Sequence, residues 1–265
     1  PHGPYPKNTD YKITDIKKQP YENKIPNYKP GYYQNIKTDN SQLGKILELS
    51  DKLKLTDNSI FIYASDHGVS GKYGLYQKGL KIPLVIRWPG NLKHNSTSNS
   101  LLTMVDILPT LVDIAGGKTN TFDGKSFLSI LKNQRNEIND FIYGVSTRQN
   151  VRYGKVFPSR MISDGKFKLI LNYNSIDQYK KYLGENDFIN KFIELGAKAY
   201  PYKPYEELYD LKTDPHETNN LANKPDHKEL KQKLTNKLKE WMKGQSDFLL
   251  YDNMPLIKPT LHPLD

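Results

Sequence analysis

The chain has 265 residues and no cysteine, and its 39 Lys and Arg residues outnumber 29 Asp and Glu residues to give a formal net charge of +10. This length allows one large domain or two ordinary ones, while the lack of cysteine excludes a disulfide scaffold, a thiolate zinc site and a cysteine nucleophile within these residues. No apolar run reaches the roughly 18 residues of a membrane span, and the basic residues form no clustered stripe that would favour nucleic-acid binding.

Helix and strand patterns alternate in the first half of the chain, after an opening stretch over 1–34 that shows neither period. Helices are predicted where apolar residues recur at a spacing of three to four, and strands where short continuous apolar runs occur. The two apolar runs are of the kind that is buried in a parallel sheet. The predicted elements are a helix over 33–55, strands over 60–64 and 82–86, a helix over 101–115, in which Pro109 forms a kink or lies near a turn, and a short helix around 127–131.

Strand patterns cluster in the second half of the chain. The predicted elements are strands over 141–146, 161–162 and 167–171, a hairpin turn over 163–166, and a helix from about 225 to 242 with an apolar stripe. Alternating elements followed by clustered strands predict two parts. We expect an α/β domain over 1–135 and a smaller C-terminal subdomain over 136–265, with an antiparallel sheet and one helix.

Asp66 and His67 directly follow the predicted strand over 60–64. In open α/β sheets, the loops beyond the carboxyl ends of strands carry the functional site. A carboxylate beside an imidazole, followed by Gly68 for close backbone approach, can hold a divalent cation. Oxygen ligands favour calcium or magnesium, and the imidazole leaves zinc or manganese open. In the alternative interpretation Asp66 caps the next turn and His67 is an ordinary loop residue.

Ordered motifs run through nearly the whole chain. Asp66-His67-Gly68 is followed by Lys72, which lies four residues before Tyr76, and then by an apolar strand that closes in Arg-Trp-Pro-Gly at 87–90. Later motifs are Val-Asp-Ile-Leu-Pro-Thr-Leu at 105–111, Phe-Asp-Gly-Lys-Ser-Phe at 122–127, Ser-Asp-Gly-Lys-Phe-Lys-Leu-Ile at 163–170, Glu-Leu-Tyr-Asp-Leu at 207–211 and Asp-Pro-His-Glu with Asn-Leu-Ala at 214–222. This series resembles the sulfatase family of the alkaline-phosphatase-like superfamily. The long insertion before the last two motifs resembles the branch that contains heparan N-sulfatases.

The resemblance implies an α/β fold: the C-terminal part of an alkaline-phosphatase-like mixed sheet flanked by helices, plus the smaller antiparallel subdomain. It further implies that Asp66 and His67 ligate the active-site cation, which is calcium in most members, with Mg²⁺ or Mn²⁺ as alternatives. Lys72 would contact the sulfate, with Lys78 as the competing candidate, and His2 in a Pro-His-x-Pro segment would also reach it. A cation, a lysine and a histidine facing a sulfuryl group lower the barrier by stabilising its growing negative charge.

Two parts of the family's catalytic machinery have no match in these residues. Sulfatases use a formylglycine made from Cys or Ser in a Cys/Ser-x-Pro-x-Arg segment, and paired Asp residues before it complete the cation site. The segment 156–160 ends in Pro-Ser-Arg, but its modifiable position is Val156, which has no heteroatom. The resemblance therefore implies an N-terminally truncated chain that is inactive alone and binds the cation weakly, with the formylglycine in the missing part.

The implied function is hydrolysis of a sulfuric ester or sulfamate, with a sulfated saccharide or glycan as the substrate. One alternative is a phosphonate or phosphodiester hydrolase of the same superfamily, which differs in its nucleophile. Another is a non-catalytic protein that binds sulfated glycans through its positive charge, in a salt-sensitive manner. The family also implies export to the periplasm, the extracellular space or the lysosome, with a signal that is not present in this sequence.

Overall fold

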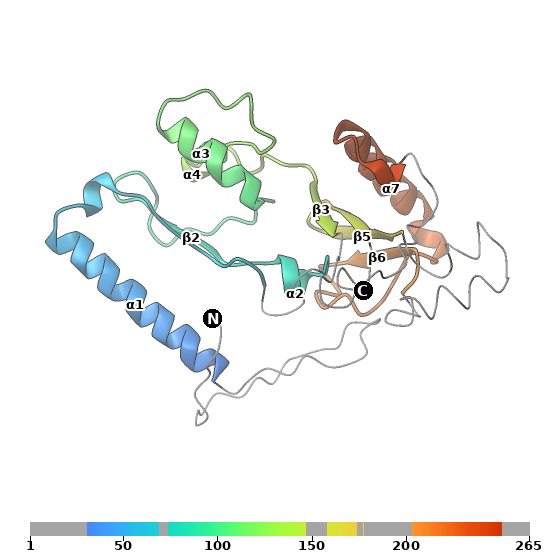
Figure 1. Ribbon diagram of the computed structural model, residues 1–265, viewed down its shortest axis with the longest axis horizontal. Coiled ribbons are helices and arrows are strands. Elements are labelled where there is room, and N and C mark those ends of the chain that lie inside the picture. Colours follow the sequence, from blue (N-terminus) through green and yellow to red (C-terminus); the bar gives the residue numbers. More distant parts are fainter. Residues whose placement is uncertain (1–30, 69–73, 147–157, 174–176, 178–202, 251–265) are drawn as a thin grey trace, which may run out of the picture. The chain divides into compact units, whose positions relative to one another are not determined.

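The computed structural model describes residues 31–68, 74–146, 158–173, 177 and 203–250 (Figure 1). These residues fall into two compact units. The first contains 31–66 and 82–97, and the second contains 67–81 and the described residues from 98 to 250. The predicted division into domains at residue 135 stays a prediction. Among the described residues, no helix is long and apolar enough to cross a membrane.

The first unit contains one long helix and a two-stranded sheet. Helix α1 (Tyr32–Lys52) confirms the helix predicted over 33–55, and the chain then turns through η1 (Thr56–Asn58). Strands β1 (Phe61–Ala64) and β2 (Leu84–Arg87) confirm the two predicted apolar strands to within one or two residues at their ends. Arg87 at the end of β2 lies 3.6 Å from a carboxylate oxygen of Asp51 in α1, so an ion pair connects the sheet to the helix.

The predicted parallel arrangement is wrong for these two strands. β1 and β2 pair antiparallel, with Phe61 opposite Arg87 and Ala64 opposite Leu84. A short apolar run does not reveal strand direction, because it is compatible with burial in either kind of sheet. A parallel connection needs a crossover of a dozen or more residues, usually a helix. The described part of this connection holds only the four-residue helix α2 (Gln77–Leu80).

Short helices form between residues 104 and 131 of the second unit. The helix predicted over 101–115 forms as η2 (Met104–Asp106) and α3 (Ile107–Ile114), and the predicted short helix forms as α4 (Leu128–Leu131). The Asp106 carboxylate accepts the backbone N–H of Thr103 at 2.8 Å, which caps the start of η2. Pro109 lies in the first turn of α3, where a backbone N–H has no partner within the helix and the ring therefore removes no hydrogen bond.

A four-stranded antiparallel sheet forms the centre of the second unit, as predicted for the smaller subdomain, with strand order β3-β4-β5-β6. Gly165 in the turn between β4 and β5 has φ +88°, and Asp164 Oδ1 accepts the backbone N–H of Lys166 at 2.9 Å, so the predicted hairpin over 163–166 is confirmed. The strands are β3 (Ile142–Ser146), β4 (Ser159–Ser163), β5 (Phe167–Asn172) and β6 (Glu206–Asp210).

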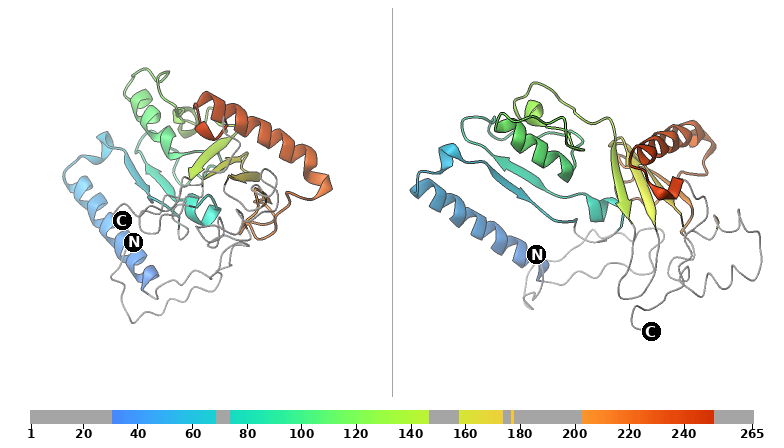
Figure 2. Two further views of the ribbon diagram at one scale, coloured as in Figure 1. Left: turned by 45° about the vertical axis from the view of Figure 1, so that its right-hand side comes forward. Right: turned by 45° about the horizontal axis from the view of Figure 1, so that its top comes forward.

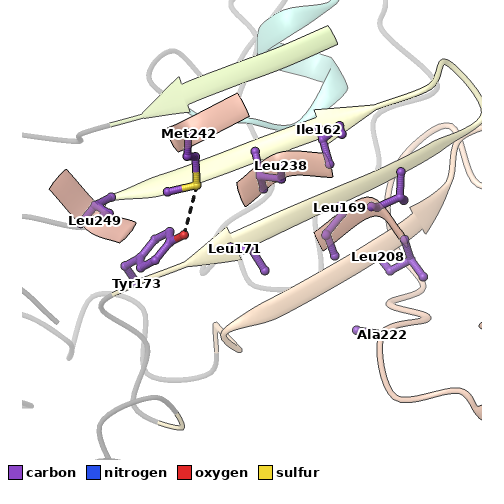
Figure 3. Packing of buried hydrophobic residues seen from close by; sticks show 10 residues of the cluster. Ile162, Leu169, Leu171, Tyr173, Leu208, Ala222, Leu238, Met242 and Leu249 are labelled. Carbon is purple, nitrogen blue, oxygen red and sulfur yellow. Dashed lines mark hydrogen bonds between the residues drawn. The ribbon is translucent and has the colours of Figure 1, made fainter. Parts of the chain in front are cut away.

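The two faces of this sheet are covered by different parts of the chain, because successive side chains of a strand point to opposite faces. Helix α7 (Lys228–Gly244), preceded by η4 (Pro225–His227), lies along one face and confirms the helix predicted from about 225 (Figure 2). Its Leu238 and Met242 are fully buried, and the hydroxyl of Tyr173 donates to the Met242 sulfur at 3.4 Å (Figure 3). The core on this face contains Ile162, Leu169, Leu171, Tyr173, Leu208, Ala222, Leu234, Leu238, Met242 and Leu249.

The opposite face of the sheet packs against two residues that directly precede α2. Leu75 and Tyr76, which come immediately before α2, are buried with side chains of the sheet. The sheet side chains in this second core are Met161, Ile170 and Tyr209. Residues 75 and 76 therefore belong structurally with the C-terminal sheet, although residues 77–141 separate them from its first strand.

Candidate active site

The predicted metal ligands lie just beyond the end of β1. Asp66 is exposed and His67 is half-buried. The Nδ1 atom of His67 lies 2.7 Å from the carbonyl oxygen of Gly68, and because a carbonyl can only accept, Nδ1 is the donor of this hydrogen bond. Metal-binding histidines commonly donate their second ring N–H to a backbone carbonyl in this way. The donor set of one carboxylate and one imidazole therefore fits a divalent cation.

A complete metal site needs more ligands than these two. In the described part of the chain, no group of three or more His, Asp and Glu residues could hold a metal ion. Asp66 and His67 therefore account for at most two protein ligands of a cation there. Their role as ligands stays a prediction.

Gly68 fixes the backbone directly after His67. Its N–H donates to the carbonyl oxygen of Gly79 in α2 at 2.8 Å. A Cβ atom at residue 68 would lie 2.2 Å from the carbonyl oxygen of Lys78. Only glycine allows this approach without a shift of the backbone, so the turn that carries His67 is held tightly against α2.

Gly68→Ala is expected to lower the free energy of unfolding by about 1–3 kcal/mol, the usual cost of forcing extra atoms into a packed site. Gly44→Ala is the matched control, because a Cβ atom at this position in α1 would meet nothing within 4 Å. The control is expected to gain about 0.5–1 kcal/mol from the better helix propensity of alanine. Urea unfolding of both variants measures the difference, and equal changes would contradict the close approach at Gly68.

A buried ion pair contacts residues 75 and 77 at the start of α2. Lys168 of β5 and Glu217 are both almost fully buried, and Lys168 Nζ lies 2.7 Å from Glu217 Oε1. Lys168 Nζ also donates to the carbonyl oxygen of Leu75 at 3.1 Å and to Gln77 Oε1 at 3.2 Å. The second carboxylate oxygen of Glu217 accepts the backbone N–H of Gln77 at 2.6 Å. Both partners of the ion pair therefore bind the same three-residue stretch.

Glu207 of β6 is a second buried acid, on the face of the sheet that packs against Leu75 and Tyr76. Its Oε2 accepts hydrogen bonds from the hydroxyls of Tyr76 and Tyr209, each at 2.6 Å. Its Oε1 accepts from the amide of Asn172 at 2.5 Å and lies 3.6 Å from the ammonium of Lys203. The carboxylate is therefore satisfied on both oxygens despite its complete burial.

Burial governs the protonation of the ion pair. Removal from water lowers the pKa of Lys168 and raises the pKa of Glu217, because it penalises the charged form of each group. The opposite charge of the partner and the hydrogen bond between them work against both shifts. Each charge thus depends on the presence of the other, and the two residues act as one unit.

Of the other residues discussed in the sequence analysis, the structure describes some and not others. His2 and Lys72 lie outside the described residues, so their roles stay predictions. Lys78, the alternative to Lys72, is half-buried in α2. Arg160, from the Pro-Ser-Arg segment, is buried and donates to both carboxylate oxygens of Asp247, and this contact connects β4 to the residues that follow α7. That arginine is therefore part of the structural core.

Sequence reasoning missed Lys168, Glu207 and Glu217. All three lie in motifs that the sequence analysis identified, at 163–170, 207–211 and 214–222. For Lys168 and Glu207 the available signal was a charged residue inside an apolar strand pattern, which indicates a buried and partnered charge. Glu217 lies in a polar loop and offered no such signal.

Two family models and a relative match most of the chain. A family model described as sulfatase matches residues 1–117, and one described as N-sulphoglucosamine sulphohydrolase, C-terminal, matches residues 65–194. An ulvan-active sulfatase of Formosa agariphila is 47% identical over 269 residues, which cover 98% of this chain and 54% of that relative. The chain thus spans about half the length of this relative.

Two solved structures resemble this chain in fold. One is a protein in complex with its substrate D-glucosamine-2-N,6-O-disulfate, with a TM-score of 0.67 and 25% identity over 83% of this chain and 41% of the other. The second is the phosphonate monoester hydrolase of Agrobacterium radiobacter, with a TM-score of 0.54 and 22% identity over 77% of this chain and 39% of the other. The second likeness concerns the fold alone. With the predicted fold class confirmed and both family models matched, the chain belongs to the sulfatase family.

Proposed function

We propose that the protein carrying these residues is a sulfatase that hydrolyses a sulfuric ester or sulfamate of a sulfated saccharide. The observation that carries the proposal is Asp66-His67-Gly68 at the end of β1, within a chain 47% identical to an ulvan-active sulfatase. Ulvan activity in that relative and a glucosamine disulfate in the solved structure both support a sulfated sugar as the substrate class. Family membership alone supports export from the cytoplasm.

The residues of this chain have distinct roles in the proposed reaction. Membership of the sulfatase family implies chemistry that uses a metal ion and a formylglycine, and the formylglycine is expected outside these residues. Asp66 and His67 would hold the ion, calcium in the first instance with Mg²⁺ or Mn²⁺ as alternatives, and the ion would supply positive charge to the sulfate oxygens. The hydrogen bond from His67 Nδ1 to the Gly68 carbonyl orients the ring, and Nε2 would be the ligand atom. Lys72 and His2 would contact the sulfate group.

The proposal is tested with the gene product that carries these residues, incubated with ulvan oligosaccharides and heparin-derived disaccharides. The expected result is release of inorganic sulfate, its loss after treatment with a chelator, and its recovery when calcium is added. The 265 residues alone are expected to release no sulfate, because they contain no Cys/Ser-x-Pro-x-Arg segment.

Two results would contradict the proposal and identify its alternatives. Cleavage of a phenylphosphonate ester or a phosphodiester without sulfate release would favour the phosphonate or phosphodiester hydrolase. Heparin binding that weakens with salt, again without sulfate release, would favour the non-catalytic glycan-binding protein.

A further inference from the structure

The three buried charged residues Lys168, Glu207 and Glu217, here named the anchor cluster, all direct hydrogen bonds to one short segment of the chain. That segment is 75–77, which follows the predicted sulfate contact Lys72 in the sequence and ends at Gln77, the first residue of α2. Lys168 binds the Leu75 carbonyl, Glu217 binds the Gln77 N–H, and Glu207 accepts from the Tyr76 hydroxyl. Each residue of the segment is therefore fixed by a different member of the cluster.

The anchor cluster is a poor device for stability alone. Removing two charges from water costs free energy that an ion pair often fails to recover, and apolar residues of similar volume serve equally well in many cores. In addition, Glu217 has φ +55°, a left-handed conformation that is uncommon for a residue with a Cβ atom. The hydrogen bonds of this arrangement are directional, and they hold the backbone carbonyl of Leu75 and the backbone N–H of Gln77 in place.

The held segment is connected to the candidate metal ligands by the backbone. Residues 75–77 include the first residue of α2, Gln77, and the carbonyl oxygen of Gly79 in α2 accepts the N–H of Gly68 at 2.8 Å. Gly68 follows His67, and its carbonyl oxygen accepts a hydrogen bond from the Nδ1–H of His67. Hydrogen bonds at both ends and the backbone of α2 between them thus connect the anchor cluster to the His67 ring.

We infer that Lys168, Glu207 and Glu217 are positioning residues of the active site, which hold residues 75–80 so that α2 fixes Gly68 and the imidazole of His67. None of the three contacts substrate in this role, since all three are buried. The inference rests on the proposed function of Asp66 and His67 as cation ligands. It assigns to the C-terminal sheet a task in cation binding in addition to its own folding.

A matched pair of variants separates positioning from stability. Tyr76→Phe and Tyr209→Phe each remove one hydroxyl that donates to the same oxygen of Glu207 at 2.6 Å, and both tyrosines are buried. Tyr76 belongs to the held segment, whereas Tyr209 belongs to β6 itself. The two rings meet edge to face at 6.2 Å, and phenylalanine preserves this contact in either variant.

The experiment uses the gene product that carries these residues and follows three quantities. These are the unfolding midpoint, the hydrogen exchange of the Gly68 and 77–80 amides, and the calcium concentration that gives half-maximal sulfate release. Both variants are expected to lose similar stability. Only Tyr76→Phe is expected to speed exchange at Gly68 and to raise the required calcium concentration, by about 10-fold, the lower end of the range for residues that orient metal ligands.

Equal calcium requirements in the two variants, together with equal exchange at Gly68, would overturn the inference. A failure of the proposed function is distinguishable from this result, because it would appear as a wild-type protein that releases no sulfate from any saccharide. The exchange of the Gly68 amide then decides by itself whether the anchor cluster holds the turn after His67, since exchange requires no activity.

Discussion

Lys168→Met is expected to lower the free energy of unfolding by about 3–5 kcal/mol, because it leaves the carboxylate of Glu217 buried without its charged partner. The double variant Lys168→Met/Glu217→Gln is expected to recover most of this loss, since it removes both charges together. The amide introduced by Glu217→Gln still offers an oxygen to the backbone N–H of Gln77, which the carboxylate binds in the native protein. Urea unfolding of the single and double variants measures the two values.

Lys237→Met provides the control for the loss of a lysine as such. Lys237 pairs with Glu240 on the exposed side of α7, at 2.9 Å and three residues away. Exposed pairs of this kind contribute little, because water and salt screen them, so no measurable change is expected. If the double variant proved as unstable as Lys168→Met, the unpaired charge would not be the cause of the loss, and this account of the ion pair would be wrong.

Asp66→Ala is expected to lower kcat/KM for sulfate release by about 1,000-fold or more, with little change in stability. A catalytic metal ion contributes several kcal/mol to the transition state, and each 1.36 kcal/mol corresponds to a factor of ten in rate. Asp66 is exposed, so its removal leaves no gap in the core. Steady-state kinetics at several calcium concentrations measure the effect.

Asp39→Asn is the matched control for Asp66→Ala, because Asp39 is an exposed acid on α1. It is expected to leave both kcat/KM and the calcium requirement unchanged. If Asp66→Ala kept its activity to within a factor of ten, Asp66 would be the capping residue of the alternative interpretation, and the cation would have other ligands.

Local patterns in the sequence predicted most individual elements. Helix α7 was predictable because its apolar residues recur along one stripe, and the β4–β5 hairpin because Gly165 can adopt a positive φ in the turn. The direction of β2 relative to β1 was not, because an apolar run is the same in a parallel and an antiparallel pair. Strand direction depends on the connection between the strands, and the pattern of the strands themselves does not record it.

In the candidate site, too, features set by neighbouring residues could be predicted, and contacts between distant residues could not. The position of Asp66 and His67 just after β1 could be predicted because a strand and the loop after it are adjacent in sequence, while their role as ligands stays a prediction. The anchor cluster could not, since the contact between Lys168 and Leu75 joins residues 93 positions apart, and that between Tyr76 and Glu207 joins residues 131 apart. The burial of Arg160 could not be predicted for the same reason: its buried partner Asp247 lies 87 positions later.

These separations also set the order in which the site can be assembled during synthesis. Gln77 leaves the ribosome 140 residues before Glu217, the residue that binds its backbone N–H. At typical elongation rates this delay is on the order of ten seconds. The turn with His67 is therefore made well before the residues that fix it. A nascent chain that stops before residue 217 contains Asp66 and His67 but lacks Glu217. If these two residues hold a cation as proposed, we expect that chain to bind it more weakly than the chain in which the C-terminal sheet has formed.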